Sequence, residues 1–128
     1  MPKNLSLSIL IFTLVIIACE RIDLGEAFTA KVGDKFRVNS RLSFSIDSLD
    51  DYRCPLLIEC LTSGDVKMFC TFYKPSNRID TAIYLVNTRN SITISGYTFK
   101  LLSVNPQSQT GEVIPQNDYR VDLIVQKD

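Results

Sequence analysis

The alternation of apolar and polar residues is the feature that most constrains how this chain folds. After residue 19, apolar side chains recur at every second position in several short runs, separated by residues that favour turns. A period of two turns one side of a strand toward a core and the other toward solvent. No segment after residue 19 has the period of an amphipathic helix. The chain therefore predicts an all-β fold.

About seven or eight short strands are expected from this pattern. In chain order, they cover residues 28–32, 36–38, 42–46, 66–72, 82–86, 92–94, 97–101 and 119–125. The turn residues at 33–34 and at 95–96 each predict a hairpin. In the run 82–86 the odd-numbered and the even-numbered positions are both apolar, which predicts a strand covered on both faces. Short strands with frequent turns favour an antiparallel β-sandwich, immunoglobulin-like in architecture, over a closed barrel.

Two connections are longer than a hairpin loop requires. Residues 47–65 are rich in Ser, Asp, Cys and Pro around a short apolar group, Leu56, Leu57 and Ile58, which predicts a loop tied down at its centre. Residues 105–117 form a long polar connection with two prolines. Because long loops commonly carry binding residues, we expect these two to form the contact surface of the protein.

The first residues have the pattern of an export signal. Lys3 is followed by an uncharged apolar run from Leu5 to Ala18, shorter than the roughly 18 to 20 residues that a helix needs to cross a bilayer. The end of this run is Val15-Ile16-Ile17-Ala18 followed by Cys19, and it resembles the bacterial lipobox: aliphatic residues, a small residue and then a cysteine. The resemblance implies removal of a signal peptide, residues 1–18, and a diacylglycerol and an acylated amine on Cys19. Several acyl chains make such an anchor durable. An uncleaved signal anchor and plain secretion remain as alternatives.

The remaining chain is long enough for one ordinary domain. Residues 19–27 are charged and have no period, so we expect a tether there and a β-sandwich domain over residues 28–128. The chain has 14 basic and 14 acidic residues without a run of either sign. This argues against nucleic-acid binding and against a basic patch for a membrane surface.

The composition excludes several kinds of catalysis. The chain has no His and no Trp, so catalysis by Ser-His-Asp or Cys-His groups and zinc bound by His are ruled out. Asp47, Asp50 and Asp51 lack the spacing of a calcium loop, which indicates a solvated acidic loop. We expect no catalytic residue, no metal and no cofactor, and predict that the protein is not an enzyme. A hydrolase that uses Asp51 is the last-ranked hypothesis.

Three cysteines follow Cys19, and they allow three pairings for one disulfide. Cys54 and Cys60 are favoured as the pair, because Cys70 shares the parity of the apolar residues in its predicted strand. Either alternative would turn Cys70 toward the loop. Cys70 is therefore expected to be a small buried hydrophobe. We expect Asp51 and Arg53 to pair with each other or to bond the loop backbone, and contact with a partner is the functional alternative.

The block that surrounds these cysteines carries a resemblance. It consists of Asp51, Tyr52, Arg53, Cys54 and Pro55, followed by Cys60 and Gly64. It resembles a block in a family of small bacterial lipoproteins common in Bacteroidota, which runs approximately Asp-Ser-Arg-Cys-Pro and then Cys-Ile-Trp-Ala-Gly. Tyr52 and Thr62 depart from that pattern. The start of the last strand, at residues 118–121, agrees as well. The resemblance implies a β-sandwich in a bacterial envelope and supplies no known activity.

The sequence as a whole predicts a non-catalytic binding or structural module, anchored by lipid to the periplasmic or outer face of a bacterial envelope. It would meet a protein or another envelope partner through residues 47–65 and 105–117. The alternative is an immunoglobulin-like protease inhibitor that inserts loops into an active-site cleft, a hypothesis that rests on analogy of fold.

Overall fold

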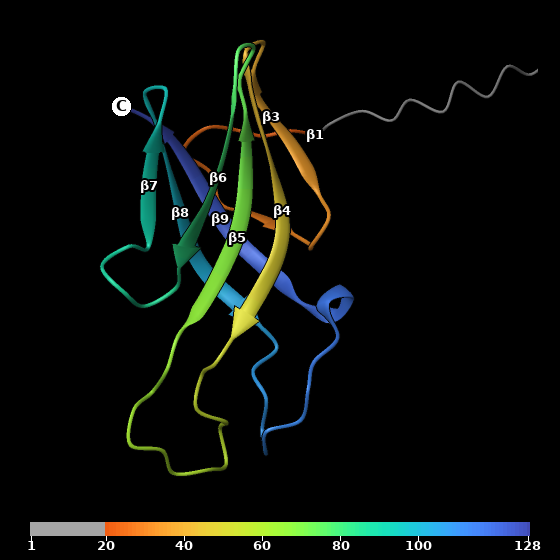
Figure 1. Cartoon of the computed structure of the whole chain (residues 1–128), viewed down its shortest axis with the longest axis vertical. Helices are drawn as coiled ribbons and strands as arrows, with labels where there is room; N and C mark the ends of the chain where they lie inside the picture. The colour runs from red at the N-terminus through yellow and green to blue at the C-terminus, as the bar shows by residue number, and fades with distance from the viewer. Residues whose placement is uncertain (1–19) are drawn as a thin grey trace, which may run out of the picture.

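The computed structural model describes residues 20–128 (Figure 1). The predicted signal peptide and Cys19 lie outside the described residues. The elements are β1 (Glu20–Arg21), β2 (Phe28–Ala30), β3 (Lys35–Asn39), β4 (Leu42–Asp51), β5 (Val66–Tyr73), β6 (Arg78–Tyr84), β7 (Ser91–Ile94), β8 (Tyr97–Asn105), the 3-10 helix η1 (Gln116–Asp118) and β9 (Arg120–Lys127). Residues 20–128 contain no helix that could span a membrane.

The strands form two sheets, which confirms the predicted all-β sandwich. One sheet has the order β1-β3-β4-β5-β6, and the other has the order β2-β9-β8-β7. All neighbouring strands are antiparallel except the short β1, which runs parallel to β3. The architecture is that of two packed antiparallel sheets, and β3 to β6 and β7 to β9 each follow one another as a meander (Figure 1).

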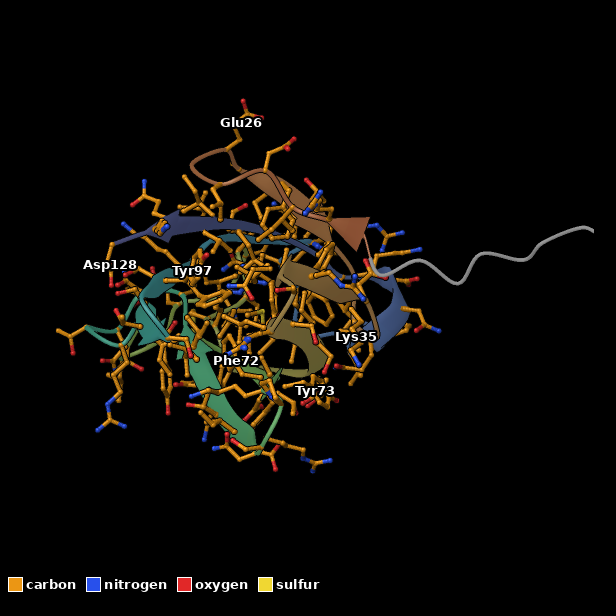
Figure 2. All side chains as sticks on the ribbon, turned by 90° about the horizontal axis from the view of Figure 1, so that it is seen from above. Glu26, Lys35, Phe72, Tyr73, Tyr97 and Asp128 are labelled. Carbon is orange, nitrogen blue, oxygen red and sulfur yellow. A yellow bond between two sulfur atoms is a disulfide. The ribbon has the colours of Figure 1, made fainter. Side chains whose placement is uncertain are left out.

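Aromatic side chains join the two sheets at the centre of the core. Phe44 and Phe72 come from one sheet and Phe99 comes from the other. The ring centroids of Phe72 and Phe99 are 4.7 Å apart, and those of Phe44 and Phe99 are 5.1 Å apart. Both pairs meet edge to face, which is a favourable arrangement for aromatic rings. Figure 2 shows Phe72 among the side chains that fill the space between the ribbons.

Cys70 lies in this core, as its parity predicts. It is a free cysteine, and 1% of its surface is exposed. Burial, with a smaller contribution from the charge of Asp47, raises the pKa of the Cys70 thiol to about 12. The thiol is therefore a packing group and not a nucleophile at neutral pH.

The hairpin predicted around Gly33 is wrong. β2 pairs with β9, and β3 pairs with β4, so the turn carries the chain from one sheet to the other. The Asp34 carboxylate accepts a hydrogen bond from the Lys31 amide at 2.9 Å, which closes the turn. Turn residues and matching parity fit both arrangements, because strands on opposite sides of a core also point their apolar residues inward.

The prediction that residues 82–86 form a strand covered on both faces is also wrong. β6 begins at Arg78, ends at Tyr84 and lies at the edge of its sheet. Within the predicted run only Ile83 is buried, whereas Val86 lies in the following loop and is exposed. The apolar run therefore combines the end of a one-sided strand with the start of a loop.

The structure also differs at the predicted tether. Glu20 and Arg21 pair with Phe36 and Arg37 of β3. The Ile22 side chain is buried in the core, and the Gly25 amide donates to the Val125 carbonyl at 2.8 Å. Part of the segment 19–27 thus lies against the domain. A two-residue strand is too short to produce a period in the sequence.

β4 is longer than predicted because its pairing contains a bulge. Ile46 is opposite Cys70 and Ser48 is opposite Phe69, which leaves Asp47 as an extra residue. Such a residue shifts the alternation by one position. Leu49 is consequently buried, the strand continues to Asp51, and the loop that follows covers residues 52–65 in place of the predicted 47–65.

Candidate functional site

Two long loops lie together at one end of the sandwich. The disulfide loop, residues 52–65, joins β4 to β5, and the long connection, residues 106–119, joins β8 to β9. The amides of Leu56 and Leu57 donate to the carbonyls of Ser108 and Gln109, at 2.9 and 2.8 Å. The two loops thus form one unit, called here the loop end, which is the lower end of the molecule in Figure 1.

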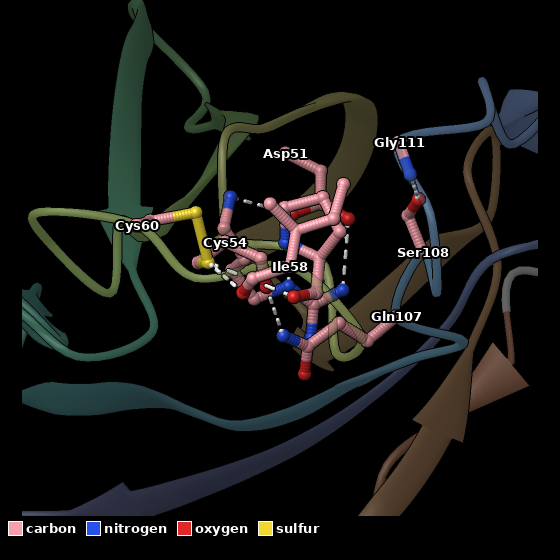
Figure 3. Close-up of a disulfide and its surroundings, with 9 residues drawn as sticks. Asp51, Cys54, Ile58, Cys60, Gln107, Ser108 and Gly111 are labelled. Atoms are coloured by element: carbon pink, nitrogen blue, oxygen red, sulfur yellow. Dashed lines mark hydrogen bonds and ion pairs between the residues drawn. A yellow bond between two sulfur atoms is a disulfide. The ribbon is translucent and has the colours of Figure 1, made fainter.

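A disulfide closes the tip of the disulfide loop. It joins Cys54 to Cys60, with 5.9 Å between their Cα atoms, and confirms the predicted pairing (Figure 3). The Gln107 side-chain amide donates to the Cys54 carbonyl at 2.8 Å. At the other end of the loop, a Cβ atom on Gly64 would collide with the Tyr52 carbonyl. Glycine is therefore required where the two arms of the loop come together.

Removal of this disulfide is expected to cost about 2 kcal/mol of unfolding free energy, because the bond closes only a short loop in the unfolded chain. The double variant Cys54→Ser/Cys60→Ser, followed by urea denaturation, measures the loss. Reduced wild-type protein is the control and should lose the same amount. A variant that no longer folds would contradict the prediction, because the core lies outside the loop.

Asp51 and Arg53 form a pair at the base of the loop end. Arg53 Nε donates to Asp51 Oδ1 and Arg53 Nη2 donates to Asp51 Oδ2, both at 2.8 Å. The guanidinium also donates to the carbonyls of Val104 and Pro106, at 2.8 and 3.0 Å. The two side chains are only 9% and 10% exposed. The predicted pairing is confirmed, and the pair ties the disulfide loop to the long connection from the inside. Because so little of either side chain is exposed, Asp51 and Arg53 offer very little surface for the alternative role of contacting a partner.

Tyr119 completes this group. Its hydroxyl donates to Asp51 Oδ2 at 2.9 Å. Burial raises the pKa of Tyr119 to about 12, and the bond to Asp51 acts in the same direction. Burial alone would raise the pKa of Asp51, but hydrogen bonds from Arg53 and Tyr119 outweigh it and hold the pKa below its ordinary value. Asp51 is therefore a carboxylate at neutral pH, and both of its oxygens already accept hydrogen bonds. This geometry does not support the hypothesis of a hydrolase that uses Asp51 as a base.

Two residues that the sequence analysis missed also hold the loop end. The Gln116 side chain pairs with the backbone of Leu49 through bonds of 2.8 and 3.0 Å, and so extends the edge of β4. The buried Asp65 carboxylate accepts hydrogen bonds from the amides of Val66, Leu85, Val86 and Asn87. No local pattern marks either residue, because Gln116 bonds Leu49 and Asp65 bonds residues 85–87, all of which are distant in the sequence.

Glu112 holds the tip of the long connection by accepting hydrogen bonds from residues two and three positions before it in the sequence. Its carboxylate accepts hydrogen bonds from the amides of Gln109 and Thr110, at 2.9 and 2.8 Å. These bonds lower the pKa of Glu112 to about 2. Since the folded pKa is depressed, the stabilisation is present above about pH 4.5 and is lost as the pH falls toward 2.

An NMR titration tests this assignment. The amide proton shifts of Gln109 and Thr110 are expected to titrate with a midpoint near 2. Glu112→Gln is the control and should abolish the titration at both amides. A midpoint at the ordinary value of a glutamate would show that the carboxylate does not bond this turn.

A small cleft opens between the two loops. Its volume is about 280 Å³, and Asp51, Arg53 and Tyr119 contribute to its lining. This is at the lower limit of ligand pockets, which usually enclose about 300–1,000 Å³. The charged groups in its lining are already bonded to each other and to the backbone. The cleft therefore offers little unused bonding capacity to a ligand.

Large apolar side chains are exposed around the tip of the loop end, contrary to the prediction of a loop tied down at its apolar centre. They are Leu56, Leu57, Ile58 and Leu61 of the disulfide loop and Val113 of the long connection. Their exposed fractions range from 45% to 106%. The loop is tied down instead by its disulfide and its backbone bonds, which leaves these side chains free to contact other molecules.

Comparisons of this chain with protein-family models, with curated proteins and with solved structures found no match.

Proposed function

We propose that this protein is a lipid-anchored module of a bacterial envelope, without catalytic activity, that binds a protein partner through its loop end. The observation that carries the binding proposal is the group of exposed apolar side chains on a loop braced by a disulfide. An exposed apolar group costs solubility unless it is covered, and a braced loop loses little conformational entropy on binding.

The place of the loop end agrees with an anchor at Cys19. Glu20, the next residue, belongs to β1, which lies in the upper half of Figure 1, and the loop end is at the opposite, lower end. A chain held at Cys19 would therefore direct its loop end away from the bilayer. Replacing Cys19 with alanine should abolish the incorporation of a labelled fatty acid into the protein, and equal incorporation by the variant and the wild type would refute the anchor.

The charges of the loop end favour a protein over a second membrane as the partner. In the loop end, residues 52–65 and 106–119, the acidic and basic side chains are Arg53, Glu59, Asp65, Glu112 and Asp118; Arg53 is paired with Asp51, and Asp65 is buried. The exposed charges are thus carboxylates, which anionic lipids repel. A protein surface with apolar side chains and basic groups would complement them.

Crosslinking in the intact envelope tests the contact surface. The variant Leu57→Ser/Leu61→Ser should lose the proteins that crosslink to the wild type. The matched control is Val86→Ser/Leu102→Ser, which removes two exposed apolar side chains elsewhere on the molecule and should retain them. If both variants retain the same proteins, the loop end is not the contact surface.

The protease-inhibitor hypothesis remains a prediction with less support. A loop that inserts like a substrate presents extended backbone to the protease. Here the Ile58 amide donates to the Pro55 carbonyl at 3.2 Å, so residues 55–58 form a turn. Inhibition of a panel of serine and cysteine proteases by the wild type, lost in Leu57→Ser/Leu61→Ser, would favour this alternative.

A further inference from the structure

A second cleft lies at the end of the sandwich away from the loop end. Its volume is about 660 Å³, and the turns β3–β4, β5–β6 and β7–β8 contribute to its wall. The polar residues of its lining are Asn39, Ser40, Arg41, Lys74, Ser76 and Ser95, and no carboxylate is among them. The fold thus brings together two cations that are distant in the sequence.

The turns that carry these cations are held by defined hydrogen bonds. The Asn39 side chain accepts from the Arg41 amide at 2.7 Å and donates to the Tyr97 hydroxyl at 3.2 Å, which joins the β3–β4 turn to β8. The Lys74 amide donates to the Asn77 carbonyl at 2.9 Å and closes the β5–β6 turn. The wall of the cleft is therefore in place before a ligand arrives, which lowers the entropy cost of binding.

The two cations are not neutralised within residues 20–128. The ion pairs there are Arg53 with Asp51 and Arg78 with Asp80, and neither involves Arg41 or Lys74. Asp128 lies beside the β7–β8 turn, where its amide donates to the Gly96 carbonyl. The Asp128 carboxylate accepts a hydrogen bond from the Thr98 hydroxyl at 2.7 Å. The cleft therefore presents net positive charge beside three serine hydroxyls, a combination suited to a phosphate group.

We propose that this cleft binds the phosphate of anionic lipid head groups and so holds this end of the sandwich against the bilayer. The choice of a lipid as the source of the phosphate rests on the proposed anchor at Cys19, because β1 enters the domain in the same half of the molecule (Figure 1). Two cations are too few for a nucleic-acid surface, which typically contacts several phosphates. They match the modest electrostatic contribution of a membrane-facing basic site, about fivefold in affinity for each charge.

Amide hydrogen exchange of the full-length protein, purified with its native anchor and placed in nanodiscs, tests the proposal. One set of discs contains phosphatidylcholine alone, and the other also contains phosphatidylglycerol. Exchange at residues 39–42 and 74–77 should slow on the anionic discs. The variant Arg41→Gln/Lys74→Gln should abolish the difference, whereas the matched control Arg89→Gln/Lys100→Gln, which removes two exposed cations elsewhere, should retain it.

The outcomes separate this proposal from the proposed anchor. Equal exchange on both kinds of disc, or a difference that survives in Arg41→Gln/Lys74→Gln, overturns the head-group site. Equal protection by inorganic phosphate on neutral discs assigns the cleft to free phosphate and also overturns it. If the protein does not stay on the discs, the anchor fails, and flotation with vesicles of the same two compositions decides the cleft. The double variant should then lose about 25-fold in affinity for anionic vesicles.

Discussion

Replacing Arg53 with methionine is expected to lower the free energy of unfolding by about 3 kcal/mol, because the Asp51 carboxylate would remain buried without its cation. The carbonyls of Val104 and Pro106 would lose their donor as well. Methionine preserves most of the length of the side chain, so the loss reports the missing charge and hydrogen bonds. Urea denaturation, followed by circular dichroism, measures it.

The chain contains its own control for this prediction. Arg78 and Asp80 have the same two-residue spacing, but both side chains are 63% exposed. Exposed pairs contribute at most about 1 kcal/mol, so Arg78→Met should have little effect. If both variants lose the same free energy, burial is not what makes the Asp51–Arg53 pair important.

Replacing Asp65 with alanine is expected to cost about 3 kcal/mol, since several backbone amides would lose their acceptor at once. The carboxylate joins the start of β5 to the loop after β6, through the amides of Leu85, Val86 and Asn87. Asp65→Asn should have an intermediate effect, because one oxygen remains while the new NH₂ group faces a donor. Urea denaturation measures the stability of both variants.

Hydrogen exchange locates the effect of the Asp65 variants. The amides of Val86 and Asn87 should lose their protection, because Asp65 is their acceptor. The Leu85 amide also donates to the Val66 carbonyl at 3.1 Å and should keep more of its protection. Asp50→Ala is the control, since Asp50 is an exposed acidic residue of β4 and its loss should change neither stability nor exchange. Unchanged protection at residues 86 and 87 in Asp65→Ala would show that the carboxylate does not hold this loop.

The sequence could predict the parts of the fold that follow from local alternation. Phe44, Phe72 and Phe99 share the parity of their apolar neighbours, and all three are buried. The same rule predicts that Cys70 lies in the core and so favours Cys54 and Cys60 as the disulfide. Alternation does not say which strands pair, so the residues around Gly33 predict a hairpin although this turn connects two sheets.

The candidate sites were less predictable because they depend on contacts between distant segments. Leu56 and Leu57 are apolar, which predicted burial, but the bonds between their amides and the long connection hold them at the surface. Arg41 and Lys74 belong to separate turns and form no run of charge in the sequence. Their common cleft exists only because the two turns lie at the same end of the sandwich.

The bulge in β4 has a consequence for how this chain can tolerate insertions and deletions. Asp47 is the extra residue, and after it Leu49 and Asp51 take the inward positions opposite Met68 and Val66. Deleting Asp47 would restore simple alternation and leave these pairings unchanged, because Ser48 would follow Ile46 directly and Leu49 and Asp51 would stay opposite Met68 and Val66. Deleting Ser48 as well would exchange the inward and outward residues of the last part of the strand and turn Asp51 to solvent, away from Tyr119. The surplus residue thus lets this strand lose one residue without displacing the buried pair, whereas the loss of a second residue would be more damaging than most substitutions.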